Sequence, residues 1–223
     1  MMMAFWRLIL ICFAFSGSLS AAHLVGGELS YTCLGNNRYE VKLLIYRDCS
    51  SNGAPFDDPA IITIYDDNLN IVANLEVPLH TSGRLPVDAP NTCYSLPSFV
   101  CTEEGLYLDT VFLPPTPGGY TLSHQRCCRN QSINNIPNPG DWGNTYTIEI
   151  PANDNSCNSS PRFTTTPPVA LCLNINNTIN TSAFDPDGDS LVYSLCFPLH
   201  GGGTQATTRG PNSPRPDTAT PPP

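Results

Sequence analysis

The chain has 223 residues, of which 19 are acidic and 10 are basic, so its formal net charge at pH 7 is −9. Nucleic acids and anionic lipid surfaces are themselves negatively charged, so this balance disfavours both as partners. Charged residues make up only 13% of the chain, and Asn, Thr, Ser and Pro take their place, which is common in extracellular β-proteins.

The first 22 residues are predicted to be a secretion signal. Arg7 precedes a short apolar run over residues 8–15, and small residues follow up to Ala22. Ser20 and Ala22 fit the positions that signal peptidase requires, and the apolar run is shorter than the roughly 20 residues of a membrane-spanning helix. We therefore expect a mature protein that begins at His23, has no transmembrane segment after signal removal, and is secreted or displayed at the cell surface.

Short strand patterns separated by turn residues follow the signal. They cover residues 27–33, 38–46, 60–65, 71–77, 98–102, 105–113, 119–126 and 144–150. The first two pairs of runs are separated by short turns and predict two hairpins. No stretch shows a sustained helical period, so these strands indicate an all-β fold, with an immunoglobulin-like β-sandwich over residues 23–152.

A turn-rich break after Pro151 separates this region from further strand patterns, the last of which covers residues 191–195. They predict about three strands of a partial cadherin-like or PKD-like domain over residues 153–200, the start of a second, incomplete β-sandwich. Residues 201–223 are rich in Pro and Gly and are predicted to be a linker or an extended loop. Because three strands cannot bury a complete core, further domains are expected beyond Pro223.

The cysteines that remain after signal removal are expected to form disulfides, since export places them in an oxidising compartment. These nine candidates are Cys33, Cys49, Cys93, Cys101, Cys127, Cys128, Cys157, Cys172 and Cys196. Spacing makes three local pairs plausible without defining the connectivity. They are Cys33–Cys49, Cys93–Cys101 and Cys172–Cys196. Because nine is odd, we expect one free thiol or a partner beyond Pro223.

The adjacent residues Cys127 and Cys128 are unusual. Neighbouring side chains on a strand point to opposite faces of the sheet, so two bridges to two different partners are expected, with a vicinal disulfide as the alternative. Zinc binding is disfavoured because the chain has no Cys-x-x-Cys pair and export oxidises thiols.

Asp185, Asp187 and Asp189 alternate around Gly188 and form the best candidate for a metal site. Three carboxylates in one loop supply the oxygen ligands that Ca²⁺ prefers. The loop is not an EF-hand, since no helices flank it, and it looks like the Asp-rich loops of cadherin-like domains. A tight Asp-Gly turn is the alternative.

Other candidate sites are weaker. An N-terminal His23 could bind copper with a second histidine, His80, His124 or His200. The acidic pairs at 57–58, 66–67 and 103–104 are neighbours in turns and are typical of solvated loop tips. No catalytic residue is predicted.

Four segments carry a resemblance to a known family. They are His23–Tyr31, Val41–Cys49, Gly119–Asn130 and Asp185–Leu195. They resemble the N-terminal region of gliding-motility-associated, type IX-secreted multidomain surface proteins of Gram-negative bacteria, and the resemblance covers nearly all of residues 23–200. It implies immunoglobulin-like or PKD-like domains exposed at the outer membrane, although the sorting module that ends those proteins is not found in this sequence.

The sequence therefore predicts a non-enzymatic, secreted or cell-surface structural or adhesion protein fragment. Its expected partners are surface glycans or proteins, and Ca²⁺ is the expected cofactor if there is one. The alternative is a carbohydrate-binding accessory region of a larger secreted enzyme.

Overall fold

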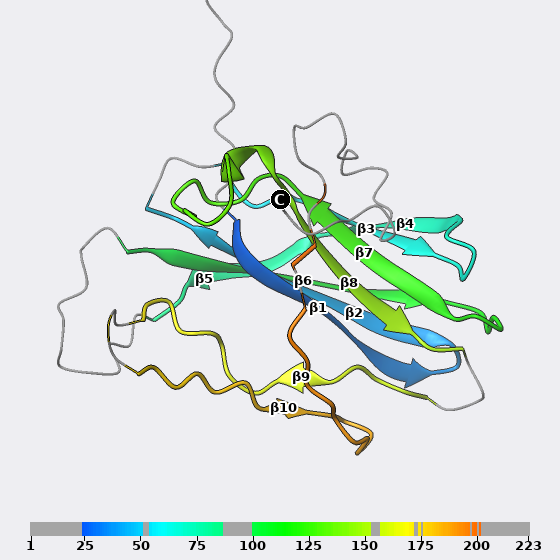
Figure 1. The fold of residues 1–223 in the computed structure, drawn as a ribbon. Coiled ribbons are helices and arrows are strands. Elements are labelled where there is room, and N and C mark those ends of the chain that lie inside the picture. Colours follow the sequence, from blue (N-terminus) through cyan, green and yellow to red (C-terminus); the bar gives the residue numbers. More distant parts are fainter. Residues whose placement is uncertain are drawn as a thin grey trace, which may run out of the picture.

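The structure is a computed structural model, and it describes residues 24–50, 54–86, 100–152, 157–171, 174, 176–196, 198–199 and 201. Eight strands form the main body. They are β1 (Leu24–Gly35), β2 (Arg38–Asp48), β3 (Ala60–Tyr65), β4 (Ile71–Val77), β5 (Leu79–Arg84), β6 (Thr102–Phe112), β7 (Tyr120–Arg126) and β8 (Asn144–Ile150). They build two layers (Figure 1), and the predicted all-β fold is confirmed.

The two antiparallel sheets have the strand orders β1-β2-β6-β5 and β4-β3-β7-β8. With strands lettered in chain order, these are the A-B-E-D and C′-C-F-G sheets of an immunoglobulin-type sandwich. This topology places the β2–β3, β5–β6 and β7–β8 connections at one end of the sandwich. The β1–β2, β3–β4 and β6–β7 turns lie at the opposite end (Figure 1).

Apolar side chains that face inward from both sheets make the core. Along the first half of β2, Tyr39, Val41 and Leu43 are buried in the alternation expected of a strand with one face toward the core, whereas residues 43–46 are buried on both faces. Fully buried apolar side chains include Val41, Leu43, Ile62, Ile64, Val77 and Leu122. Burying each such side chain contributes roughly 1.5–3 kcal/mol, so the sandwich is a rigid support for the loops at its ends.

One expected strand of the sandwich was wrong in its described part. Of the run 98–102, residues 100 and 101 lie outside any strand and Thr102 begins β6. In its place β5 pairs with the opposite edge of β6, where Ser82 lies across from Gly105. An edge strand of this kind needs backbone pairing on one side only, so it can form without an apolar pattern.

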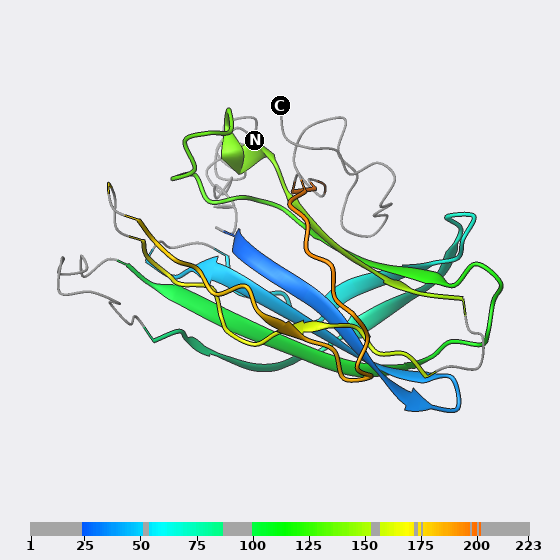
Figure 2. The same cartoon turned by 60° about the horizontal axis from the view of Figure 1, so that its bottom comes forward.

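The edge of β1 is covered by the chain that follows β8. The backbone N–H of Ser160 donates to the Tyr31 carbonyl at 3.0 Å, and the Tyr31 N–H donates to Ser160 Oγ at 2.9 Å. The Cys33 N–H donates to Ser159 Oγ at 3.2 Å. These bonds satisfy backbone groups that an open edge strand would leave free for pairing with another chain. Figure 2 shows this later segment, in yellow and orange, running along the sandwich.

The later segment forms much less sheet than expected. Only β9 (Arg162–Phe163) and β10 (Ala183–Phe184) pair, as a two-stranded antiparallel ladder. Residues 191–195 were predicted to be a strand but have no strand pairing, and Val192 is 95% exposed. A two-stranded ladder cannot enclose a core, which explains why the apolar residues of this segment stay exposed. In the described part of the chain, no helix is long and apolar enough to cross a membrane.

Gly119 closes the sandwich at the end opposite the loops and gives a testable prediction. Its φ is +74°, and a Cβ there would collide with the carbonyl oxygen of Ile150. Gly35 has a similar φ of +80° but open space around it. We expect Gly35→Ala to cost about 1 kcal/mol for the left-handed backbone, and Gly119→Ala to cost about 1–3 kcal/mol more for the clash. Urea unfolding of both variants measures the difference, and equal costs would contradict the packing described for Gly119.

Candidate functional site

The best candidate site is the end of the sandwich where three long connections meet. We call this the loop end, made of the described residues within 49–59, 85–101 and 127–143. In immunoglobulin-type folds the corresponding B–C and F–G connections carry binding residues, since the sheets hold them in place while their sequences are free to vary. The described contacts below fix these connections to one another.

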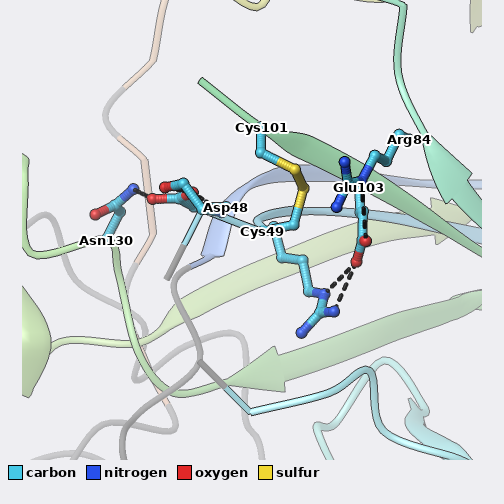
Figure 3. The surroundings of a disulfide bond; sticks show 8 residues. Asp48, Cys49, Arg84, Cys101, Glu103 and Asn130 are labelled. Atoms are coloured by element: carbon cyan, nitrogen blue, oxygen red, sulfur yellow. Dashed lines mark hydrogen bonds and ion pairs between the residues drawn. A yellow bond between two sulfur atoms is a disulfide. The ribbon is translucent and has the colours of Figure 1, made fainter. Parts of the chain in front are cut away.

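A disulfide joins two of the connections. Cys49 follows β2 and Cys101 precedes β6, and they are bonded across 52 residues of sequence (Figure 3). The Cys49 N–H also donates to the Cys101 carbonyl at 3.0 Å. Since β2 and β6 are neighbours and Asp48 lies across from Thr102, these cysteines are the next pair in the same ladder.

The predicted local cysteine pairs were therefore wrong. Cys33 lies near the β1–β2 turn and Cys49 at the far end of β2, which an extended strand places roughly 30 Å apart. Cys33 instead bonds to Cys157, which follows β8, with their Cα atoms 5.4 Å apart. Cys93 and Cys172 lie outside the described residues, and Cys196 is exposed and free.

Charged side chains bond the β2–β3 connection to the sheet beside this disulfide. Arg47 donates through Nη2 and Nε to Glu103 Oε2, at 2.6 and 2.9 Å, and Arg84 Nε lies 3.9 Å from the other oxygen of Glu103 (Figure 3). Nη1 of Arg47 donates to the carbonyl of Ala54 at 2.7 Å, and its guanidinium carbon lies 4.9 Å from the centre of the Phe56 ring. Arg47 therefore fixes residues 54–56 to the sheet.

Three further contacts hold the end of β7 and the β7–β8 connection against the end of β2 and the β2–β3 connection. Asn130 Nδ2 donates to Asp48 Oδ2 at 3.1 Å (Figure 3). Arg126, at the end of β7, forms a two-point ion pair with Asp57, through Nε at 2.7 Å and Nη2 at 3.0 Å. Arg126 Nη2 also donates to the Pro55 carbonyl at 2.7 Å. The loop end is thus held together by a disulfide, ion pairs and hydrogen bonds.

Cys127 and Cys128 form a disulfide with each other. The expected pairing of each with a different cysteine was therefore wrong, and the alternative, a vicinal disulfide, is confirmed. The expectation assumed a continuing strand, but β7 ends at Arg126. The chain then turns to meet the start of β1, where the Leu24 N–H donates to the Cys128 carbonyl at 3.1 Å. Because the strand has ended, alternation between opposite faces does not apply to these two residues.

His124 lies just inside the loop end and is 3% exposed. Its Nδ1 is 2.8 Å from the carbonyl oxygen of Ile61, which can only accept, so Nδ1 carries the proton. Burial lowers the pKa of this imidazole from its ordinary value of 6.5, with the Ile61 bond and Asp57 acting in the opposite direction. His124 is therefore neutral at pH 7.

This burial predicts a pH dependence. Since the folded-state pKa of His124 is below the unfolded value, its contribution is fully present above about pH 6.5 and is lost at lower pH, by about 1.4 kcal/mol per pH unit until the folded-state pKa is reached. His124→Asn keeps a donor near the Nδ1 position, and should flatten this slope in urea unfolding measured one pH unit above and one below 6.5. His80→Asn, which alters an exposed imidazole on β5, should leave the slope intact. An unchanged slope in His124→Asn would contradict a neutral, buried imidazole.

The loop from Asp185 to Asp189, which is predicted to bind calcium, forms hydrogen bonds within itself and to the segment beside β1. Asp185 Oδ1 accepts the N–H groups of Asp187 and Asp189, at 2.9 and 3.2 Å, and Asp187 Oδ2 accepts the Ser159 N–H at 2.5 Å. This is the hydrogen bonding of a tight turn that docks onto the segment beside β1. Within the described ranges no three His, Cys, Asp or Glu side chains are grouped to hold a metal ion. Calcium binding stays a prediction.

Copper binding stays a prediction as well. His23 and His200 lie outside the described residues, His80 is exposed on β5, and His124 is buried in β7 with Nδ1 bonded to Ile61.

Comparisons with known proteins do not add a function. No family model, curated protein or solved structure matches the chain.

Proposed function

We propose that the chain is a non-enzymatic, exported surface protein that uses the loop end for adhesion. The observation that carries this proposal is the bracing of the loop end: the Cys49–Cys101 disulfide, the Arg126–Asp57 ion pair and the Asp48–Asn130 bond hold the connections in one arrangement. A surface whose loops are already ordered loses less entropy when it binds a partner.

The expected partners are surface glycans or proteins. The predicted secretion signal and the resemblance to gliding-motility-associated surface proteins support export, and disulfides suit an oxidising compartment. The acidic net charge of −9 favours neutral or basic partners over polyanions. A calcium ion at Asp185, Asp187 and Asp189 would be an accessory to this function, since it would stiffen the segment next to β1.

The test uses the secreted chain, fluorescently labelled and applied to an array of neutral polysaccharides and immobilised extracellular proteins. Asn135→Arg places a bulky charge on an exposed part of the loop end, and Asn68→Arg makes the same change in the exposed β3–β4 turn at the opposite end. We expect binding to be lost in Asn135→Arg and kept in Asn68→Arg. The reverse pattern would place adhesion at the other end of the sandwich, and substrate turnover on the array would overturn the non-enzymatic reading.

A further inference from the structure

Two arginines are buried at the base of the loop end, and among the residues that the structure describes they have one carboxylate partner between them. Arg126 and Arg129 are each 7% exposed. Asp57 pairs with Arg126, whereas Arg129 has no carboxylate within ion-pair distance among the residues that the structure describes. A buried charge is costly unless it is paired, so this region has one excess positive charge to balance.

Both guanidinium groups also retain unused donors. Arg126 commits Nε and Nη2 to Asp57 and Pro55, while its Nη1 is buried without a partner in the described part of the chain. Arg129 commits Nη2 to the Leu199 carbonyl at 2.8 Å, and its Nε is buried without a partner in the same sense. The buried hydroxyl of Tyr146 is a third such donor.

The strand register brings these donors to one place. Tyr146 on β8 lies directly across from His124 on β7, and Arg126 lies two residues further along β7, on the same face as His124. The Leu199 carbonyl accepts both the Thr145 N–H, at 3.3 Å, and Arg129 Nη2, so the Arg129 guanidinium lies beside β8 at Thr145, the residue before Tyr146. Burial raises the pKa of the Tyr146 hydroxyl, and the two guanidinium groups act against that rise.

The neighbouring imidazole helps to define the ligand chemistry. Because His124 Nδ1 donates to Ile61, the neutral ring presents a lone pair at Nε2, which would repel an anion. The ligand set is therefore limited to the two guanidinium groups and the tyrosine hydroxyl. A single negative charge matches the excess positive charge of Arg129, and the burial of all three donors favours a small ion.

We propose that Arg126 Nη1, Arg129 Nε and Tyr146 Oη bind a small monovalent anion, such as chloride. The anion would connect the chain segment on both sides of the Cys127–Cys128 disulfide to β8. This assignment is independent of adhesion, because it concerns the support of the loop end and not its exposed surface.

The test compares thermal unfolding of the intact oxidised chain in sodium chloride and in sodium gluconate at equal ionic strength, since gluconate carries the same charge as chloride but is a much larger ion. At a hundredfold excess of chloride over Kd, we expect Tm to be about 5–10 °C higher in chloride. Arg129→Gln should abolish the difference. Arg84→Gln, which changes an arginine whose side chain is 74% exposed, should keep it. Equal Tm values in the two salts for the unaltered chain would overturn the proposal.

Two further measurements keep the test decisive if Arg129→Gln fails to fold. Tyr146→Phe removes one donor with little change of shape, and should weaken the chloride dependence roughly tenfold in concentration. Crystals of the unaltered chain grown in sodium bromide should show an anomalous peak within hydrogen-bond distance of Arg126 Nη1 and Arg129 Nε. Bromide peaks only at other positions, or a Tyr146→Phe variant with unchanged chloride dependence, would contradict the ligand set.

Discussion

Replacement of both Cys33 and Cys157 by serine is expected to lower the free energy of unfolding by about 5 kcal/mol. This disulfide closes a loop across 124 residues, from the end of β1 to the segment after β8, and so encloses almost the entire sandwich. In the chain-entropy account, a disulfide that closes a longer loop removes more freedom from the unfolded state. Urea unfolding of the oxidised protein, with and without the double substitution, measures the loss.

Two sets of control substitutions give the scale for this result. Replacing Cys49 and Cys101 opens a loop across 52 residues, so it should cost about 4 kcal/mol, slightly less than the first pair. Cys196→Ser alters an exposed, free thiol and should change stability by less than about 0.5 kcal/mol. A loss below about 1 kcal/mol for Cys33 and Cys157 would mean that this bond does not constrain the unfolded chain as the model of loop entropy requires.

Asp57→Asn is expected to destabilise the protein by about 3 kcal/mol, at the lower end of the range for breaking a buried ion pair. The Arg126 side chain is 9% exposed, so the substitution leaves a buried guanidinium without its carboxylate. Asp57 is itself 49% exposed, which keeps the effect from being larger. Asparagine preserves the shape of the side chain, so urea unfolding reports the loss of charge and not the loss of packing.

A second substitution tests whether the effect of Asp57→Asn comes from the loss of its ion pair with Arg126. Arg126→Met removes the charge that Asp57 neutralises, so the double variant should be more stable than the sum of the two single effects implies. Asp67→Asn makes the same chemical change in the exposed β3–β4 turn and should stay within about 0.5 kcal/mol of the unaltered protein. Strict additivity of the Asp57 and Arg126 substitutions would show that the two side chains do not interact.

The sequence predicted strands well where one face is buried. Residues 38–43 alternate polar and apolar side chains, and with the apolar run 43–46 they form most of β2, in the interior of a sheet. The sequence did not predict β5. Leu79–Arg84 is a polar edge strand held by backbone hydrogen bonds to β6, and such bonds leave no pattern in the side chains. The prediction also failed for residues 191–195, whose strand-like pattern finds no neighbouring strand in the described structure.

The contacts of the loop end could not be predicted from local patterns. Asp57 belongs to an acidic pair typical of a solvated turn, and its partner Arg126 lies 69 residues later in the chain. The cysteine pairs show the same limit, since Cys49 and Cys101 meet only because β2 and β6 are neighbours in the sheet. Each of these contacts depends on which strands lie side by side, which is a property of the whole fold.

The disulfide map of the secreted protein tests the account most directly. Digestion by trypsin without reduction should place Cys33, Cys49 and Cys157 in the separate peptides 23–38, 48–84 and 130–162, and Cys101 in peptide 85–126. The fold predicts that peptide 23–38 is linked to 130–162, and that 48–84 is linked to 85–126 through Cys101. A link between peptides 23–38 and 48–84, or free thiols at all four positions, would contradict both the sandwich and the braced loop end on which the proposed function depends.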